Sequence, residues 1–190
     1  MLIKPVFKVL DVLQVPRLLE FILNLLVNVT RLTAEELEAA GQVLGTNAID
    51  YSAERVGEGR LLPLYFMINR DRATTLFHTI LLPSKGRHAR GRLDLFVHEL
   101  VHVYQFEKVG SIYIWQAIMA QMGAGCRYGE VDGLEERRKE GQTFSGFNRE
   151  QQGQVAQDYY HDVLEKDLAA NSRERLAFQP FIEELQAGLL

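Results

Sequence analysis

Residues 93–106 read Leu-Asp-Leu-Phe-Val-His-Glu-Leu-Val-His-Val-Tyr-Gln-Phe, with the pattern His98-Glu99-x-x-His102 at their centre. On an α-helix, residues four apart lie one turn apart on the same face, so both imidazoles can reach one tetrahedral metal ion beside Glu99. Apart from Gln105, the other positions after Asp94 are apolar or aromatic, which predicts a helix buried on nearly all sides. Histidines in such a helix are costly to bury unless they bind a metal or form hydrogen bonds. The stretch therefore predicts a zinc site, against the alternative of a core helix with hydrogen-bonded histidines.

The same pattern predicts a reaction type. Zn²⁺ bound by two imidazoles usually takes a third protein ligand and keeps a fourth position open for water. The metal lowers the pKa of that water, and a neighbouring carboxylate accepts its proton as the water attacks a polarised carbonyl group. We therefore expect Zn²⁺ as the cofactor and Glu99 as the general base of a hydrolytic reaction.

The composition fits one globular domain. The chain has 190 residues, of which 47% are hydrophobic and 24% charged, enough for a substantial core. A net charge of -4 gives no general attraction to nucleic acid, and no nucleic-acid-binding motif is present. The single cysteine, Cys126, cannot form an internal disulfide, so the fold does not depend on an oxidising compartment. We expect Cys126 to be an ordinary small residue.

No segment has the composition of a membrane span or a signal peptide. The apolar run at residues 21–29 is interrupted by Asn24 and Asn28 and is shorter than the roughly 20 residues that a spanning helix needs. The N-terminus lacks a strongly basic start and a small-residue cleavage site. We expect a cytoplasmic location, or export by a non-classical secretion system.

Two helices are predicted before the sheet. Pro16 and the apolar period that follows it predict an amphipathic helix over residues 16–29, within an N-terminal extension of residues 1–32. This helix can dock on its own domain, on a partner protein or on a membrane surface. Thr33 and Glu36 form a capping box that starts a second helix, Ala34 to Leu44.

Three β-strands are predicted next, at Tyr51 to Val56, Leu62 to Ile68 and Thr74 to Leu82, with a hairpin turn at residues 69–72. The edge of such a sheet can bind an extended peptide by adding a strand. His78 alternates with apolar neighbours, so we interpret it as structural rather than as a ligand.

Two loops and three further helices complete the prediction. The basic loop at residues 83–92 is expected to be solvated, with His88 too flexible for a ligand, and residues 123–148 are expected to form a long loop. The predicted helices run from a Ser111 cap to Met122, from Glu150 to about Leu168, and from a Ser172 cap to a bend or end at Pro180.

The third metal ligand should be a His, Glu or Asp on a rigid element after the motif. The closely spaced third histidine of the metzincins is absent, and Glu107 is turned away from the imidazole face. Glu150 opens a helix and is a candidate, although the helix dipole alone also favours a carboxylate there. Asp158 and His161 lie further along the same helix and remain alternatives.

At this point the sequence resembles a known family. The string His-Glu-Leu-Val-His-Val-Tyr-Gln, Gly110 with Tyr113, Phe-Asn-Arg-Glu-Gln-Gln at residues 147–152 and Asp-Tyr-Tyr at 158–160 are similar to small bacterial zincin-like peptidases. These are Vgr-related or secretion-spike-associated proteins, broadly similar to gluzincins, and the likeness covers about residues 37–163. It implies Glu150 as the third zinc ligand. Gluzincins carry an Asp four residues after this Glu, whereas this chain has Gln154, so the surroundings of the ligand should differ.

We therefore expect an α+β fold, mainly helical, with a small β-sheet before the motif helix and one zincin-like metallopeptidase domain at residues 33–190. The expected function is a zinc-dependent peptidase that acts on a peptide or protein substrate, with Zn²⁺ on His98, His102 and Glu150. Glu99 would act as base and later donate a proton to the leaving amine. The alternative is a catalytically inactive zinc-binding interaction module associated with a secretion apparatus, which retention of Glu99 argues against.

A further donor should stabilise the oxyanion of a tetrahedral intermediate, and tyrosines do this in many zincins. Tyr159 is our candidate for that role. Tyr113, Tyr128 and Tyr160 are also available, and each of the four is otherwise a core or surface aromatic residue.

Overall fold

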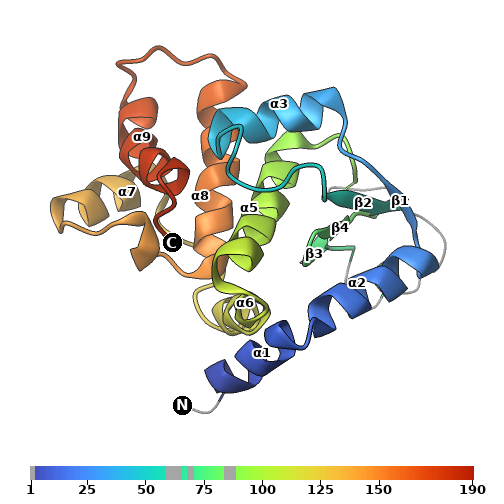
Figure 1. Ribbon diagram of the computed structural model, residues 1–190. Coiled ribbons are helices and arrows are strands. Elements are labelled where there is room, and N and C mark those ends of the chain that lie inside the picture. The colour runs from blue at the N-terminus through green and yellow to red at the C-terminus, as the bar shows by residue number, and fades with distance from the viewer. Residues whose placement is uncertain (1–2, 59–65, 68–70, 84–88) are drawn as a thin grey trace.

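The computed structural model describes residues 3–58, 66–67, 71–83 and 89–190. Helix α5 (Leu93–Val109) runs through the middle of the molecule, and every residue from Asp94 to Gln105 is buried. The sheet lies on one side of α5, and helices α7, α8 and α9 lie on the other side (Figure 1). The nearly continuous apolar sequence of α5 is therefore explained by neighbours on all sides.

The fold class is confirmed: the chain forms a mainly helical α+β domain in which a small sheet precedes α5. Side chains from α3, α5, α8 and α9 and from the sheet form one core, which includes Leu100, Tyr104 and Phe181. No helix in the described part of the chain is long and apolar enough to cross a bilayer. The other α-helices are α1 (Ile3–Val12), α2 (Val15–Leu26), α3 (Ala34–Val43), α6 (Ile112–Met122), α7 (Glu130–Lys139), α8 (Arg149–Tyr159) and α9 (Arg173–Gln186).

The sheet has the strand order β1-β2-β4-β3. Strands β2 and β4 are parallel, and the two outer pairs are antiparallel. Strand β3 therefore forms one edge of the sheet, on the side where α5 contacts it. The strands are β1 (Asn28–Thr30), β2 (Arg55–Glu58), β3 (Thr74–Leu76) and β4 (Thr79–Leu81).

The single strand predicted from Thr74 to Leu82 is wrong, because the chain reverses at Phe77 and His78 to form the β3–β4 hairpin. Phe77 has φ +59°, and the apolar alternation continues across the turn, so the pattern alone did not mark it. Of the strand predicted from Tyr51, only its last two residues lie in β2. The prediction for residues 62–68 falls mostly outside the described residues, and Phe66 and Met67 are helical.

The long loop predicted at residues 123–148 is also wrong, because it contains α7. This helix has acidic residues in its first turn and basic residues in its last, which suits the helix dipole, and Leu134 is buried. Gly129 and Gly133 on either side of its start made the segment resemble a loop. Pro180 does not end α9, which continues to Gln186.

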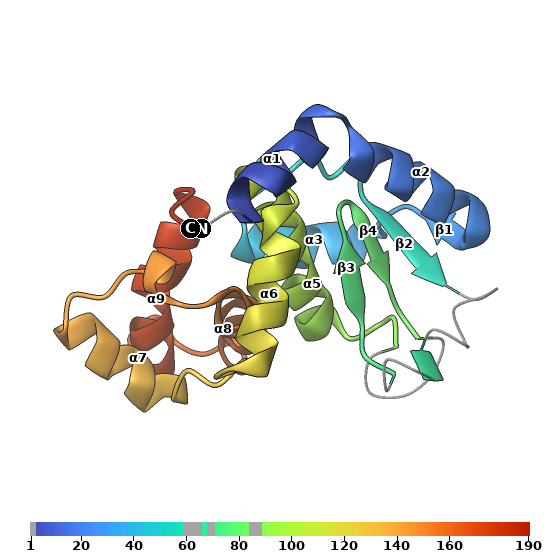
Figure 2. The same cartoon turned by 90° about the horizontal axis from the view of Figure 1, so that it is seen from below.

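The N-terminal segment forms two helices and an edge strand. Helix α2 ends at Leu26 rather than Val29, because residues 28–30 pair with β2 as strand β1. Figure 2 shows α1 and α2 along one side of the molecule, from α6 to the sheet. Ser111 does not cap α6 with its side chain; instead, both carboxylate oxygens of Asp11 in α1 accept from the Ser111 N–H at 3.2 Å.

Candidate metal centre

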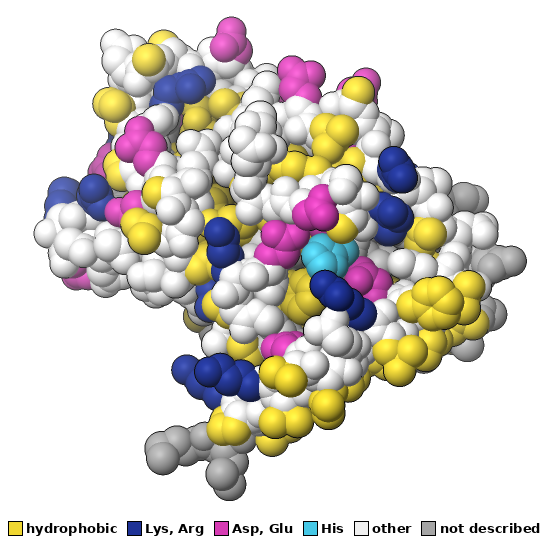
Figure 3. All heavy atoms as spheres, viewed as in Figure 1, with side chains coloured by type: hydrophobic (Ala, Val, Ile, Leu, Met, Phe, Trp, Pro, Cys, Tyr) yellow, Lys and Arg dark blue, Asp and Glu magenta, His cyan; other side chains and the backbone are white. Residues whose placement is uncertain are grey.

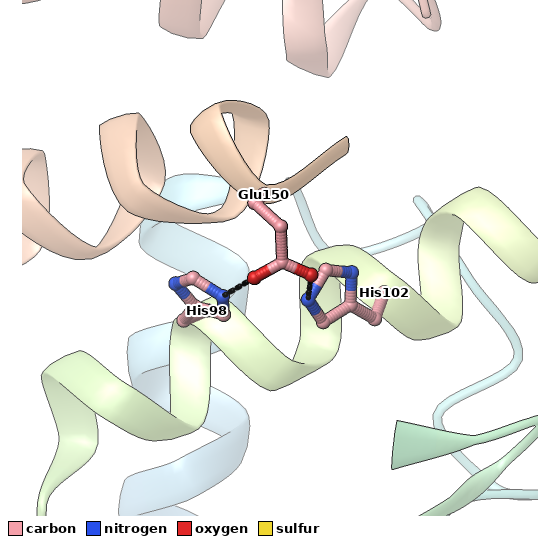
Figure 4. Close-up of side chains that lie close together, drawn as sticks. All are labelled: His98, His102 and Glu150. Atoms are coloured by element: carbon pink, nitrogen blue, oxygen red, sulfur yellow. Dashed lines mark ion pairs between the residues drawn. The ribbon is translucent and has the colours of Figure 1, made fainter. Parts of the chain in front are cut away.

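Three of the predicted ligands lie together. His98 and His102 occupy successive turns of α5, and Glu150 lies in the first turn of α8. The Nε2 atom of His98 is 3.9 Å from Glu150 Oε2, and that of His102 is 3.6 Å from Oε1. Figure 4 shows the carboxylate of Glu150 pointing between the two rings. The residues are only 6%, 7% and 5% exposed, so two nitrogens and a carboxylate converge in a buried space.

The position of Glu150 follows from the start of α8. Asn148 caps the helix, with a reciprocal capping box between Asn148 and Gln151, which fixes where the first turn begins. Negative charge is favoured in a first turn by the helix dipole. Gln121 of α6 donates to Glu150 Oε1 at 3.1 Å, and the Cys126 thiol donates to Oε2 at 3.7 Å. The carboxylate is thus held in place from α6 and from the segment after it.

The Cys126 thiol beside Glu150 has a raised pKa. Burial raises the pKa of Cys126 to about 11, and the neighbouring carboxylate of Glu150 adds to the effect. Because a thiolate is the form that binds metal or attacks as a nucleophile, Cys126 acts here as a hydrogen-bond donor.

Close packing of α8 on α5 depends on Gly153. A Cβ atom at this position would lie 2.8 Å from His98 Nε2 and 2.9 Å from two carbons of the same ring. Such distances are well inside van der Waals contact, so only glycine lets the α8 backbone lie against the imidazole. Gly153 follows Glu150 by three residues, which places both on the face of α8 that meets α5.

The orientation of His102 is set by Gln105, one turn later on α5. The two residues contact through His102 Nδ1 and Gln105 Oε1, 2.9 Å apart. The amide nitrogen of Gln105 donates to the Arg149 carbonyl and to Gln152 Oε1, so its oxygen is the atom that faces the ring. Nδ1 of His102 therefore carries the proton, and Nε2 presents its lone pair towards Glu150, as a metal ligand requires.

Glu99 is buried beside the two histidines. Its Oε2 accepts a hydrogen bond from the hydroxyl of Thr75 on β3 at 2.7 Å. Burial raises the pKa of Glu99 above its ordinary value, and the neighbouring His102 and the Thr75 hydroxyl act in the opposite direction. Thr75 thus orients the predicted base from the edge strand of the sheet.

The alternative third ligands are engaged elsewhere. Asp158 accepts from the Tyr128 hydroxyl at 2.6 Å and from Gln154 at 2.7 Å. His161 contacts Glu165 at 2.8 Å on an exposed surface. Gln154, where gluzincins have an aspartate, is thus bonded along its own helix to Asp158.

Tyr159 lies in the hydrophobic core. Its ring is buried and is 6.0 Å from that of Phe178 in α9. It follows Glu150 by nine residues, about two and a half helical turns, which turns it to the opposite face of α8. This placement gives no support to Tyr159 as an oxyanion donor.

The edge of β3 is partly occupied. The Tyr113 hydroxyl donates to the Thr75 carbonyl at 3.0 Å and accepts from the Phe77 N–H at 3.2 Å. These are backbone groups of the kind that an added strand would use. An extended peptide that pairs with β3 at Thr75 would therefore have to displace Tyr113.

The donor set fits zinc. Two neutral imidazoles and one carboxylate are the protein ligands of many catalytic zinc sites. A ligand histidine in such a site usually forms a hydrogen bond through its other ring nitrogen, as His102 does with Gln105. Comparisons with protein-family patterns, with curated proteins and with solved structures give no match for this chain. The assignment therefore depends on the geometry of these side chains.

Two contributors to the site were not predicted. Gln105 is the polar exception in an apolar helix, three residues after His102, and this exception was the available signal. Gly153 is a glycine inside a predicted helix, which often marks a close approach of another element.

Proposed function

We propose that this protein is a zinc-dependent hydrolase that cleaves peptide bonds. The observation that carries the proposal is the convergence of Glu150 with His98 and His102, beside a buried Glu99 held by Thr75. A bound Zn²⁺ would polarise the scissile carbonyl group and lower the pKa of a water molecule.

The protein's own groups have separate tasks in this proposal. Glu99 accepts the proton of the attacking water and returns it to the leaving amine, so no proton is gained or lost overall. Thr75 fixes the direction of the Glu99 carboxylate through the bond to Oε2. Gln105 keeps the protonated nitrogen of His102 away from the ligand position.

The rival function is a zinc-stabilised interaction module without turnover. The burial of both histidines and of Glu150 favours it, since a metal that only stabilises the fold does not need access to substrate. A structural site, however, has no use for a buried carboxylate next to the metal, and it is usually closed by four protein ligands. Glu99 therefore favours the hydrolase.

Glu99→Gln distinguishes the hydrolase from the interaction module. The amide cannot accept a proton from water, so we expect unchanged zinc content and loss of cleavage of a pool of fluorescence-quenched peptides. Glu38→Gln, an exposed change on α3, is the matched control and should keep full activity. Wild-type protein that holds zinc but cleaves nothing, or Glu99→Gln with full turnover, would reject the proposal.

Metal content tests the ligands directly. Replacing Glu150 by Ala should weaken zinc affinity by orders of magnitude, because the only carboxylate that reaches the two imidazoles among the described residues is then removed. Asp158→Ala, on the same helix, is the control and should leave zinc affinity unchanged, since Asp158 bonds Tyr128 instead.

We also propose that α1 and α2 rest on an anionic membrane surface. The two helices expose a continuous set of large apolar side chains, and Figure 3 shows hydrophobic side chains along this edge of the molecule. Both acidic residues bond inward, Asp11 to Ser111 and Glu20 to His78 and Thr79. The basic residues Lys4, Lys8 and Arg17 are exposed. Apolar side chains with exposed basic residues suit an interfacial helix on anionic lipid.

Vesicle co-sedimentation tests this second proposal. The protein should sediment with vesicles that contain anionic lipid and less with purely zwitterionic ones. A Leu18→Asn/Phe21→Asn variant should lose most of the binding, whereas Leu176→Asn, an equally exposed change on α9, should not. If the Leu18→Asn/Phe21→Asn and Leu176→Asn variants sediment equally with anionic vesicles, α2 is excluded as the docking surface.

A further inference from the structure

A second group of potential metal ligands lies on the sheet side of α5. Ligand atoms of Glu54, His78 and Glu107 all lie within 4.8 Å of one another. Glu54 precedes β2, His78 is in the turn between β3 and β4, and Glu107 is near the end of α5. The group is separate from the His98–His102–Glu150 site, although both use α5.

Glu54 is the unusual member of this group. The residue is completely buried, and neither of its carboxylate oxygens has a hydrogen-bond partner within the described residues. Leaving a buried polar group unsatisfied costs about 1–3 kcal/mol, and more when it is charged. A structural role for the carboxyl group alone does not explain why an acidic residue occupies this position.

His78 lies between carboxylates. Its Nδ1 is 3.4 Å from Glu20 Oε2, and its Nε2 is 3.4 Å from Glu107 Oε1. Glu20 also accepts from the His78 backbone N–H at 2.9 Å, which fixes the turn against α2. A carboxylate on one ring nitrogen is the usual arrangement behind a histidine that binds metal through the other nitrogen.

The group holds three carboxyl groups, those of Glu20, Glu54 and Glu107, around the one imidazole of His78. Burial raises the pKa of Glu54 to about 9, and hydrogen bonds to Glu107 and Glu20 raise the pKa of His78 to about 10. Without a bound metal, the neutral form of Glu54 and the charged form of His78 are therefore favoured. No ion pair links these carboxylates to a Lys or Arg in the part of the chain that the structure describes. Within the described residues, His78 is thus the one side chain that forms ion pairs with these carboxylates.

The site is open to an incoming ion on one side. The side chains of His78 and Glu107 are 23% and 24% exposed, whereas Glu54 is closed off beneath them. Figure 3 shows a histidine side chain at the surface on the face of the molecule seen in Figure 1, with acidic side chains and a basic side chain next to it. An ion can thus enter from solvent and meet the buried carboxylate last.

We propose that Glu54, Glu107 and His78 Nε2 form a second divalent-metal site, with Glu20 orienting the imidazole. One nitrogen and several carboxylate oxygens suit a first-row divalent cation such as Zn²⁺ or Mn²⁺. The bound ion joins the segment before β2, the β3–β4 turn and α5, and through Glu20 it also holds α2. This proposal is independent of the proposed hydrolysis.

The test is the number of zinc equivalents bound after chelator treatment and equilibrium dialysis, read by elemental analysis. Wild-type protein should bind two equivalents of Zn²⁺, and Glu54→Gln, which has almost the same size and shape, should bind one. Glu38→Gln is the matched control and should bind two. Circular dichroism confirms that each variant is folded, and Glu107→Gln at the partly exposed ligand repeats the test with less risk to the core.

The two sites fail separately in this experiment. One equivalent that disappears in His102→Ala but persists in both Glu54→Gln and Glu107→Gln would overturn the second site and leave the first intact. A single zinc equivalent that persists in His102→Ala but disappears in both Glu54→Gln and Glu107→Gln would support the second site. It would also remove the metal on which the proposed hydrolysis depends. No bound zinc in the wild type, with no Mn²⁺ bound in its place, would overturn both.

Discussion

The α-carbon of Gly153 lies directly against the imidazole of His98, so that even a methyl group there would come within 2.8 Å of Nε2. Gly153→Ala should therefore push the ring away from Glu150 or separate α8 from α5. We expect zinc affinity to fall at least tenfold, together with a loss of about 1–3 kcal/mol in the free energy of unfolding from overpacking. Zinc titration and denaturant unfolding measure the two effects.

Gly41→Ala is the matched control, because it is also a glycine inside a helix and its added methyl group would meet Thr46 at an ordinary 3.5 Å. It should leave zinc affinity unchanged and stabilise α3 by up to about 1 kcal/mol. Equal zinc affinity in both variants would show that the ring of His98 is not constrained by α8.

Gln105→Leu removes the acceptor that fixes the tautomer of His102. Loss of such a partner typically weakens metal affinity by about 10–100-fold. Gln105→Glu retains an oxygen for His102 Nδ1 while losing donation to Arg149 and Gln152, so it should retain more of the affinity. If both changes weaken zinc binding equally, Gln105 acts by joining α5 to α8 and not by orienting the ring.

Thr75→Val removes the hydroxyl that bonds Glu99 while almost preserving side-chain shape. This bond lowers the pKa of Glu99 against the larger, opposite effect of burial, so its loss should raise that pKa further. A base must be deprotonated to act, so the acid limb of the rate profile should move to higher pH with zinc content unchanged. Thr143→Val, at an exposed hydroxyl, should leave the profile where it is.

Asp94→Asn tests the start of α5. Burial disfavours the charged form of Asp94, but hydrogen bonds from Arg92 and Gln157 outweigh it and hold its pKa below the ordinary 3.8. A lowered pKa in the folded state stabilises the protein above about pH 4, and this stabilisation is lost as the pH falls through the folded value.

We therefore expect Asp94→Asn to cost about 1–3 kcal/mol at pH 7 and progressively less in acid, measured by denaturant unfolding across that range. Asp162→Asn, which removes an exposed pair with Lys166, should change stability by less than about 0.5 kcal/mol at either pH. If Asp94→Asn lowers the free energy of unfolding by the same amount at pH 7 and in acid, the charge of Asp94 contributes nothing to stability.

Local sequence signals predicted the parts of the structure that they control. The apolar run around His98 predicted α5, and the capping box at Thr33 marked the start of α3, since a cap is set by neighbouring residues. The turn at Phe77 was missed because it lacks a usual turn residue, and α7 was missed because glycines flank its start.

Contacts between distant segments were harder to predict from the sequence. The motif on α5 predicted that a third ligand exists, but spacing alone left Glu150, Asp158 and His161 open, because the choice depends on how α8 packs on α5. The spatial neighbours of His78 were beyond any periodic pattern, since Glu20, Glu54 and Glu107 come from three other segments. Because His78 alternates with apolar residues in the sequence, we interpreted it as a structural residue rather than as a ligand.

Strand β1 is the outer edge strand of the sheet. It covers the backbone of β2 on the outer side of the sheet, opposite to β3. A chain shortened to begin at Thr33 would present the bare hydrogen-bonding groups of Val56 and its neighbours to solvent, which is a template for intermolecular strand pairing. Strand β1 thus shields this edge from intermolecular pairing, and a truncated protein should precipitate or form oligomers more readily than the full chain.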